Sequence, residues 1–240
     1  NLTREMGYWV NMDDPYITYK PKYMESVWWI LKQIYNKDLL YKGYTIQPYS
    51  PKAGTGLSSH ELNQPGTYQD VTDTTVVAQF NITNSPKYPE LEGAFFLAWT
   101  TTPWTLPSNT ALTVGPKIDY VLVETFNQYT FERIRVILAK PLVSAQFAGK
   151  FFEVESADEL ANYNDKKIPY CVGAEFKGAD LVGIRYEQLM KHALPNDNPQ
   201  NAFRVIAGDF VTTDDGTGIV HTAPTFGADD ALVAKQAVPE

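Results

Sequence analysis

The feature that most constrains the fold is a series of short segments, rich in β-branched and aromatic residues, that begins near residue 71. Turn signals separate these segments, as in β-rich domains. Strands are predicted at 76–82, 94–100, 120–125, 131–139 and 203–207, and short helices at 141–148, 156–162 and 228–237. Several strands at close intervals with few helices predict an α+β fold, built on a closed or nearly closed β-barrel with peripheral helices.

The first 70 residues have a different pattern. Met24, Val27, Trp28 and Leu31 recur at helical spacing, which predicts an amphipathic helix over 21–37. A short strand is predicted at 41–49. Repeated prolines and glycines then break the chain, so 50–70 is interpreted as a linker or a hairpin. We therefore expect a connecting segment at 1–60 and the main domain at 61–240.

Composition excludes several classes of protein. A net charge of −8 argues against a self-sufficient nucleic-acid binder, because neutralising phosphates needs a dense basic surface. Cys171 is the only cysteine, so a disulfide within the chain and a metal site of several thiolates are both excluded. The sequence has no apolar run long enough to cross a bilayer. We expect no membrane partner, no metal ligands and a reducing, cytoplasmic setting.

Two segments combine small hydroxyl, amide and acidic groups with chain-breaking residues. In the first, at 99–112, a predicted strand runs into Thr100, Thr101 and Thr102, and Pro103 and Pro107 then interrupt any regular ladder. A backbone freed in this way exposes N–H groups beside hydroxyl donors and acceptors. The residues alone leave two interpretations open: a binding site, or a threonine-rich edge strand followed by a turn.

The second segment covers 214–230. A turn framed by Gly216 and Gly218 leads into a short strand that ends at His221, and a loop then delivers Asp229 and Asp230 to a helix start. An acidic pair there is also typical of an ordinary helix N-terminus. Likewise, a histidine at a strand end is more often a structural hydrogen-bonding group. The glycines do not form a phosphate loop, because its lysine and glycine spacing are absent.

Together the two segments resemble the editing domains of the class I isoleucyl, valyl and leucyl tRNA synthetases. The motifs are Trp-Thr-Thr-Thr-Pro-Trp-Thr-Leu-Pro-Ser-Asn-Thr-Ala at 99–111 and Gly-Thr-Gly-Ile-Val-His-Thr-Ala-Pro-Thr-Phe-Gly-Ala-Asp-Asp at 216–230. The resemblance continues at 49–58 and 178–187, although Gln188 stands where the family usually has proline. Within the family, the second motif is similar to the isoleucyl pattern, through His221, Ala223, Pro224, Phe226 and Gly227.

The resemblance implies a function. The synthetic site of this family cannot fully reject an amino acid that is one methylene too small, so a second site must remove it. For an isoleucyl member, the partners would be the 3′ end of tRNA(Ile) carrying valine and the rest of the synthetase chain. Residues 1–60 would be an edge of the catalytic domain and 61–240 the editing domain. The ATP-site signatures are absent from the sequence, so ATP and Mg would belong to the parent enzyme's synthetic site and no cofactor is expected here.

The resemblance also implies site residues. Asp230 aligns with the aspartate that binds the substrate's ammonium group, while Asp229 is expected to be a cap or a surface charge. Thr100, Thr101 and Thr102 would hold the ester carbonyl, the ribose and a water. The side-chain pocket and its supports would be formed by His221, Asn109, Trp99 and Gly216.

Three rival functions stay open. One is a β-barrel binding module with no enzymatic role, which composition permits but the paired motifs argue against. A valyl-type editing domain would remove threonine instead of valine. A catalytically inactive module would only position tRNA, although such a module would need a basic surface more than a small acidic pocket. No Ser/His/Asp or Cys/His constellation indicates a covalent route. Ser58, Ser59 and His60 are neighbours in the predicted linker, and His192 is expected at the surface.

Overall fold

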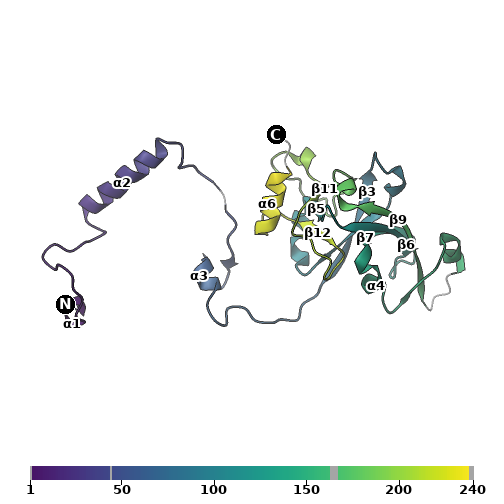
Figure 1. Ribbon diagram of the computed structural model, residues 1–240, viewed down its shortest axis with the longest axis horizontal. Helices are drawn as coiled ribbons and strands as arrows, with labels where there is room; N and C mark the ends of the chain where they lie inside the picture. The colour runs from purple at the N-terminus through teal and green to yellow at the C-terminus, as the bar shows by residue number, and fades with distance from the viewer. Residues whose placement is uncertain (1, 44, 163–166, 238–240) are drawn as a thin grey trace. The chain divides into compact units, whose positions relative to one another are not determined.

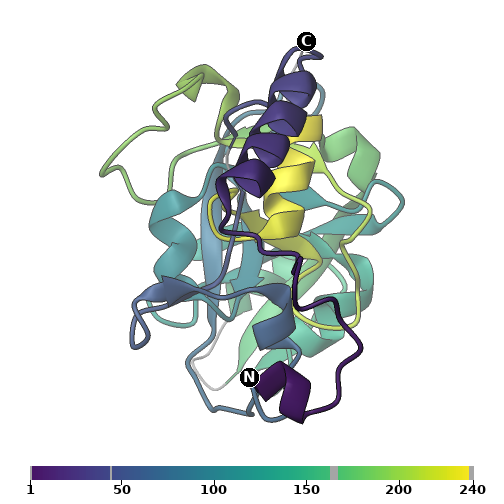
Figure 2. The same ribbon diagram turned by 90° about the vertical axis from the view of Figure 1, so that its left-hand side faces the viewer.

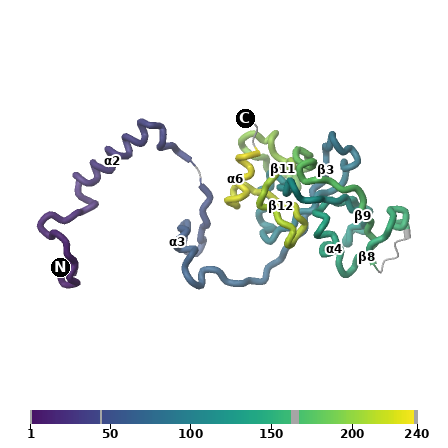
Figure 3. The backbone as a smooth tube through the Cα atoms, in the orientation of Figure 1, coloured from purple at the N-terminus to yellow at the C-terminus, as the bar shows by residue number. Residues whose placement is uncertain are grey.

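The computed structural model describes residues 2–43, 45–162 and 167–237, drawn as a ribbon in Figures 1 and 2 and as a tube in Figure 3. The chain divides into two compact units, Asn1–Thr45 and Ile46–Glu240. This boundary lies before the predicted division at residue 60. That division concerns the domains of a longer protein and stays a prediction. Among the described residues, no helix is long and apolar enough to cross a membrane.

The first unit contains two helices, α1 (Leu2–Glu5) and α2 (Pro21–Tyr35). The second confirms the helix predicted over 21–37, two residues shorter at its end. Pro21 starts it, at a position where a missing N–H costs no hydrogen bond. None of its described side chains is buried, and Trp28 and Trp29 are each about two-thirds exposed.

The second unit opens with a small hairpin of β1 (Tyr49–Ser50) and β2 (Thr55–Gly56), followed by α3 (Ser59–Leu62). Of the 50–70 region interpreted as a linker or a hairpin, the first part is thus a hairpin, and the rest contains α3 and no strand. The strand predicted at 41–49 is wrong for the part of this range that the structure describes, 41–43 and 45–49, where only Tyr49 is in a strand; residue 44 lies outside the described residues. A strand needs a neighbour for its backbone N–H and C=O groups, and the hairpin supplies one only from Tyr49 onward.

Six strands form a closed barrel, which confirms the predicted fold class. Going round it, the order is β12-β5-β11-β10-β3-β4, and a further pairing of β12 with β4 closes the ring. Closure removes the unpaired edges that an open sheet would expose. The strands are β3 (Val76–Asn84), β4 (Phe95–Thr100), β5 (Ala111–Val114), β10 (Arg185–Tyr186), β11 (Arg204–Ala207) and β12 (Ile219–Thr222).

Four further strands extend the sheet from one edge of β4, in the order β7-β6-β9-β8. They are β6 (Asp119–Phe126), β7 (Arg133–Ala139), β8 (Phe151–Glu153) and β9 (Ile168–Lys177). The edge of β4 is shared: Phe95 and Phe96 pair with β7, whereas Trp99 pairs with Val220 of β12. The sheet therefore forks along β4, and we call the four-strand extension the outer limb.

Helical segments occupy several connections between strands, and one more helix follows the last strand. They are η1 (Pro89–Leu91), η2 (Pro103–Ser108), η3 (Lys140–Leu142), α4 (Val143–Gln146), η4 (Ala157–Asn162), α5 (Gly178–Leu181), η5 (Pro199–Asn201) and α6 (Ala228–Gln236). The predicted helices at 141–148, 156–162 and 228–237 correspond to η3 with α4, to η4 and to α6. Figure 1 shows α6 beside β5 and β11 of the barrel. Its Val233 packs against Ala111 and Ile206.

Strand alternation divides the apolar side chains of β4 between two cores. Phe96 and Ala98 point into the barrel, where they join the main cluster of buried residues. Leu97 points to the opposite face and packs with Val121 and Leu138 of the outer limb. Because successive side chains of a strand face opposite sides, one strand serves both cores. Packing on both faces therefore fixes the position of β4 up to Thr100.

Candidate active site

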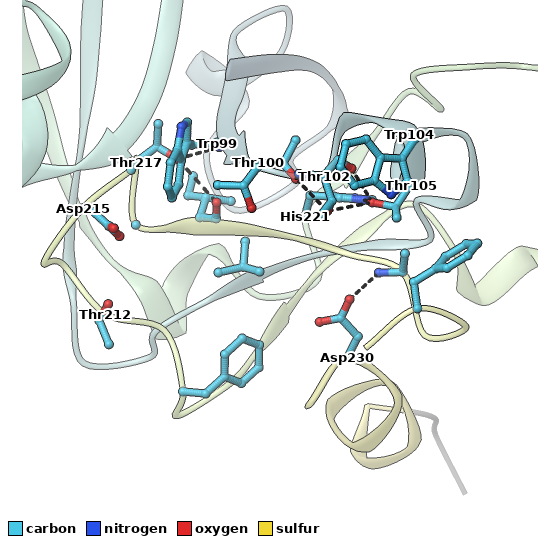
Figure 4. A pocket seen from close by; sticks show the side chains of 18 residues that line it. Trp99, Thr100, Thr102, Trp104, Thr105, Thr212, Asp215, Thr217, His221 and Asp230 are labelled. Atoms are coloured by element: carbon cyan, nitrogen blue, oxygen red, sulfur yellow. Dashed lines mark hydrogen bonds between the residues drawn. The ribbon is translucent and has the colours of Figure 1, made fainter. Parts of the chain in front are cut away.

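A pocket of about 460 Å³ lies where β4 ends, close to the turn before β12 and the start of α6 (Figure 4). This volume is typical of sites for small ligands. Its walls come from the end of β4, from η2, from the 210–218 loop, from β12 and from the chain leading into α6. The lining residues are Trp99, Thr100, Thr101, Thr102, Trp104, Thr105, Phe210, Thr212, Asp215, Gly216, Thr217, Gly218, Ile219, Val220, His221, Ala223, Phe226 and Asp230.

The three successive threonines mark the point where the chain leaves β4. Thr100 is buried, whereas Thr101 and Thr102 are exposed. The backbone N–H of Thr102 donates to Thr100 Oγ1 at 3.1 Å, so a side chain replaces the ladder partner that the strand has lost. Pro103 then begins η2, because its fixed φ suits the first turn of a helix. The hydroxyls of Thr100 and Thr102 lie 3.3 Å apart.

The turn before β12 packs against the indole ring of Trp99. Gly216 has a φ of +71°, and a Cβ atom at this residue would lie 2.9 Å from that ring. Glycine is therefore required at this position for two reasons, the left-handed backbone conformation and the close approach of the backbone to the indole ring. The next residue completes the contact, since the N–H of Trp99 donates to Thr217 Oγ1 at 3.2 Å.

His221 is held through both ring nitrogens. Its Nδ1 lies 2.8 Å from Asn109 Nδ2, and its Nε2 lies 3.0 Å from Thr105 Oγ1. Asn109 Nδ2 also donates to the Ala111 carbonyl at 2.8 Å, which fixes that end of the amide as the NH₂ group. An amide nitrogen can only donate, so His221 Nδ1 accepts and the ring proton lies on Nε2. The ring thus donates to Thr105.

This network reaches the threonines. Thr105 Oγ1 donates to the Thr102 carbonyl at 2.8 Å and lies 3.3 Å from Thr102 Oγ1. Figure 4 shows Thr100, Thr102 and Thr105 following one another toward His221. The imidazole and the hydroxyl cluster are therefore one hydrogen-bonded unit.

Burial keeps the imidazole neutral. It lowers the pKa of His221 from 6.5 to about 4, and a hydrogen bond to the backbone of Thr105 offsets only part of this shift. The side chain is 7% exposed, which leaves one edge in the pocket wall. A neutral ring with both nitrogens engaged is a poor proton acceptor. His221 consequently acts as a shaped and rigid part of the wall.

Asp230 lies across the pocket in the first turn of α6. Its Oδ2 accepts a hydrogen bond from the N–H of Ala223 at 2.9 Å, and Figure 4 shows the carboxylate facing the pocket. Burial is the main cause that raises the pKa of Asp230, the bond from Ala223 lowers it, and the neighbouring Asp229 raises it. Burial penalises an unpaired charge, so this carboxylate favours a cationic partner.

The charged side chains that line the pocket are all acidic. Its lining includes two carboxylates, Asp215 and Asp230, and no lysine or arginine. With His221 neutral, no cationic side chain offsets them at neutral pH. The pocket therefore attracts ammonium groups and repels phosphates and carboxylates.

The structure brings seven of the eight sequence-predicted site residues to this pocket: Trp99, Thr100, Thr101, Thr102, Gly216, His221 and Asp230. The eighth, Asn109, is buried behind His221 and touches the site through that ring. Asp229 is exposed, as expected of a surface charge. The roles assigned to these residues stay predictions.

Sequence reasoning did not single out Thr105 or Asp215, which also line the pocket. Thr105 lies within the first quoted motif and Asp215 directly precedes the second, and this position was the available signal. Ser58, Ser59, His60 and His192 are not part of the pocket lining. Within the described ranges, no group of three or more histidine, cysteine, aspartate or glutamate side chains is arranged to hold a metal ion.

Comparison with known proteins relates the chain to one family. The model of the class I tRNA synthetases (I, L, M and V) matches residues 1–212. Isoleucine--tRNA ligase of Bacteroides fragilis is 63% identical over 99% of this chain, and that of Cytophaga hutchinsonii is 62% identical over 98%. The chain spans about a fifth of the length of these relatives, 20% and 21%. A crystal structure of the P. knowlesi cytosolic leucyl-tRNA synthetase editing domain is 13% identical, with a TM-score of 0.45, over 65% of this chain and 60% of that one.

Proposed function

Because the chain belongs to the class I tRNA synthetases, the family of the isoleucine, leucine, methionine and valine enzymes, we propose that its barrel pocket is an editing site. The substrate is tRNA(Ile) that carries valine, and the reaction is hydrolysis of the aminoacyl ester. Water attacks the carbonyl carbon and the bond from that carbon to the ribose oxygen breaks. The products are valine and tRNA with a free terminal hydroxyl.

One observation carries this proposal: a half-buried carboxylate and a cluster of hydroxyls share one pocket that has no cationic side chain in its lining. An aminoacyl ester presents a free ammonium group a few atoms from its carbonyl. Asp230 supplies a partner for the ammonium, and a charge-assisted hydrogen bond of this kind is worth about 1.5–3 kcal/mol. Placed in this way, the ester extends toward the threonines.

The hydroxyl cluster supports the hydrolytic step. Thr100 and Thr102 offer oxygen atoms that can accept a hydrogen bond from a water or a ribose hydroxyl. Holding water and ester together removes much of the entropic barrier, and an aminoacyl ester is already reactive. We assign no proton transfer to His221, because its nitrogens are engaged with Asn109 and Thr105.

In this proposal, His221 selects the amino acid by the size of its side chain. Its ring is fixed by two hydrogen bonds, so the wall cannot yield to a larger side chain. Valine fits beside it, whereas the extra methylene of isoleucine collides with the ring. Overfilling a rigid cavity by one methylene typically costs about 1–3 kcal/mol.

The remaining partners follow from charge. The net charge of −8 gives the chain little affinity for tRNA, so the rest of a synthetase chain would hold the tRNA body. The reaction requires no cofactor at this site, while ATP and Mg serve the synthetic site of the longer protein. The setting is the cytoplasm, where charged tRNA is made and used.

The test compares Asp230→Asn with the matched control Asp229→Asn in the full-length protein. Both variants remove one carboxylate charge from the same helix turn, but only Asp230 lines the pocket. We expect Asp230→Asn to lower kcat/KM for deacylation of valyl-tRNA(Ile) at least tenfold, since a charge-assisted hydrogen bond is lost. Asp229→Asn stays within about twofold of wild type, and isoleucine activation is unchanged in both.

Normal deacylation by Asp230→Asn would refute the site. Wild-type protein that hydrolyses threonyl-tRNA but spares valyl-tRNA would instead establish the valyl-type alternative. Wild-type protein that hydrolyses neither ester would leave the tRNA-positioning module as the function.

A further inference from the structure

Tyr186, on β10, is a buried tyrosine that stands outside the pocket but is bonded to its wall. Its hydroxyl donates to Asn109 Oδ1 at 2.7 Å, and its side chain is 3% exposed. Burial raises the pKa of Tyr186 well above its usual value, so the hydroxyl keeps its proton and remains a donor. The mechanism proposed above does not use this residue.

The hydrogen bonds that start at Tyr186 run in one direction. Tyr186 donates to the Asn109 oxygen, and the Asn109 nitrogen donates to His221 Nδ1. The ring proton on Nε2 then points to Thr105 Oγ1, and Thr105 donates in turn to the Thr102 carbonyl. At each step, the role of one atom as donor or acceptor fixes the role of the atom that it faces.

We propose that Tyr186 is a positioning residue that fixes the Asn109 amide and, through it, the proton-bearing nitrogen of His221 and the conformation of the threonine turn. This inference rests on the proposed function, because it assigns Tyr186 a part in the same hydrolysis. Tyr186 acts through Asn109 and His221 and does not touch the substrate.

Loss of the hydroxyl has a defined consequence. Asn109 Oδ1 would become a buried acceptor without a donor, which a protein interior tolerates poorly. The amide cannot simply turn over, because its oxygen would then face the Ala111 carbonyl, but it can tilt toward another donor, which weakens its bond to His221 Nδ1. Nδ1 is then no longer fixed as the acceptor. A ring proton that moves to Nδ1 makes Nε2 an acceptor, which draws the Thr105 proton away from the Thr102 carbonyl. The threonine turn would lose one of the bonds that hold it.

The substitution Tyr186→Phe isolates this effect. The ring of Tyr186 packs edge-on against Phe80 at 5.3 Å and against Phe203 at 6.3 Å between centroids, and phenylalanine keeps both contacts. A matched control is Tyr170→Phe on β9. Tyr170 is also buried, its hydroxyl lies 3.4 Å from Glu153, and it is not among the pocket residues.

The experiment measures steady-state deacylation of valyl-tRNA(Ile) by the full-length protein, with threonyl-tRNA as a second substrate. We expect Tyr186→Phe to lower kcat about tenfold and to change KM less than twofold, because Asp230 still binds the ammonium group. Tyr170→Phe leaves both constants unchanged. The thermal midpoint of each variant is recorded, so that a general loss of stability is distinguished from a loss of positioning.

A double-mutant cycle completes the test. Thr105→Val breaks the other end of the same chain of hydrogen bonds, so we expect Tyr186→Phe with Thr105→Val to be no slower than the slower single variant. Losses that multiply, an unchanged kcat in Tyr186→Phe, or equal losses in both tyrosine variants would overturn the inference. Wild-type protein that is inactive on both substrates refutes the proposed function itself, which is a different result from an active wild type with an unaffected Tyr186→Phe.

Discussion

In the proposed site, His221 contributes a shape and no proton transfer. Asn109 and Thr105 engage its two nitrogens, and burial keeps it neutral. What the ring contributes to the pocket is a fixed edge. At this scale the relevant property is therefore the space that the side chain occupies.

Removing that side chain should relax the size limit. We expect His221→Ala to hydrolyse correctly charged isoleucyl-tRNA(Ile) about ten- to a hundredfold faster than wild type, because the steric cost of the extra methylene disappears. The measurement is deacylation of purified isoleucyl-tRNA(Ile), with His192→Ala as an exposed control. If His221→Ala still spares isoleucyl-tRNA, another residue sets the limit.

The turn that precedes β12 is an element whose conformation depends on a glycine. Gly216 combines a positive φ with close contact to Trp99, whereas Gly149 has a nearly identical φ of +70° and no atom within 4 Å of a Cβ position. The two glycines therefore separate backbone strain from displacement of the indole ring.

Alanine at each position tests this separation. Gly216→Ala and Gly149→Ala should each lose about 1–2 kcal/mol of stability, the typical cost of a left-handed conformation with a Cβ. Only Gly216→Ala should also lower the rate of valyl-tRNA deacylation, because Trp99 must move. Urea unfolding and deacylation assays measure the two effects. Equal activity of the two variants would show that the Trp99 contact is irrelevant to the site.

The strands that could be predicted from sequence are those whose own residues have strong β propensity. The segment at 120–125 is an example, and β6 covers it. The segments missed include the short strands β8 and β10, as well as β5, which follows directly on the threonine motif, and β9, whose Pro169 and Gly173 resemble breaks in a strand. These segments are strands because neighbours in the sheet bond to them, and sequence periodicity does not report on such neighbours.

The candidate site shows the same limit. Its polar residues could be located because they lie in two continuous motifs. The link from Tyr186 to Asn109 joins residues 77 positions apart, and the link from Thr105 to His221 joins residues 116 positions apart. Only the closed barrel brings such pairs together, so local pattern could not predict that Tyr186 supports the wall.

For the whole molecule, the depressed pKa of His221 predicts acid sensitivity. Between pH 6.5 and about 4, His221 binds a proton in the unfolded chain but not in the folded chain. The free energy of unfolding therefore falls as the pH is lowered through this window. Each pH unit corresponds to about 1.4 kcal/mol, which makes the full loss about 3 kcal/mol. Asp230, whose pKa is raised, acts in the opposite direction and offsets part of it.

Urea midpoints at pH 7 and pH 4.5, followed by circular dichroism, measure this loss. His221→Gln should flatten the difference between the two pH values, because glutamine does not titrate, and His192→Gln should leave it unchanged. A wild-type midpoint that does not move over this range would contradict the assignment of a neutral, buried imidazole.

The fork along β4 has a consequence for how such a molecule can change over time. The outer limb pairs with β4 at Phe95 and Phe96, while the threonine turn and β12 meet the same strand farther along, at Trp99. The limb meets the turn before β12 again at its near end, where the N–H of Ala139 donates to the Thr217 carbonyl. Insertions and deletions around β8, farther out on the limb, fall in a stretch whose described residues, 147–162 and 167, do not line the pocket. Descendants of one ancestral barrel can therefore vary this branch to contact new neighbours while the residues of the pocket keep their places.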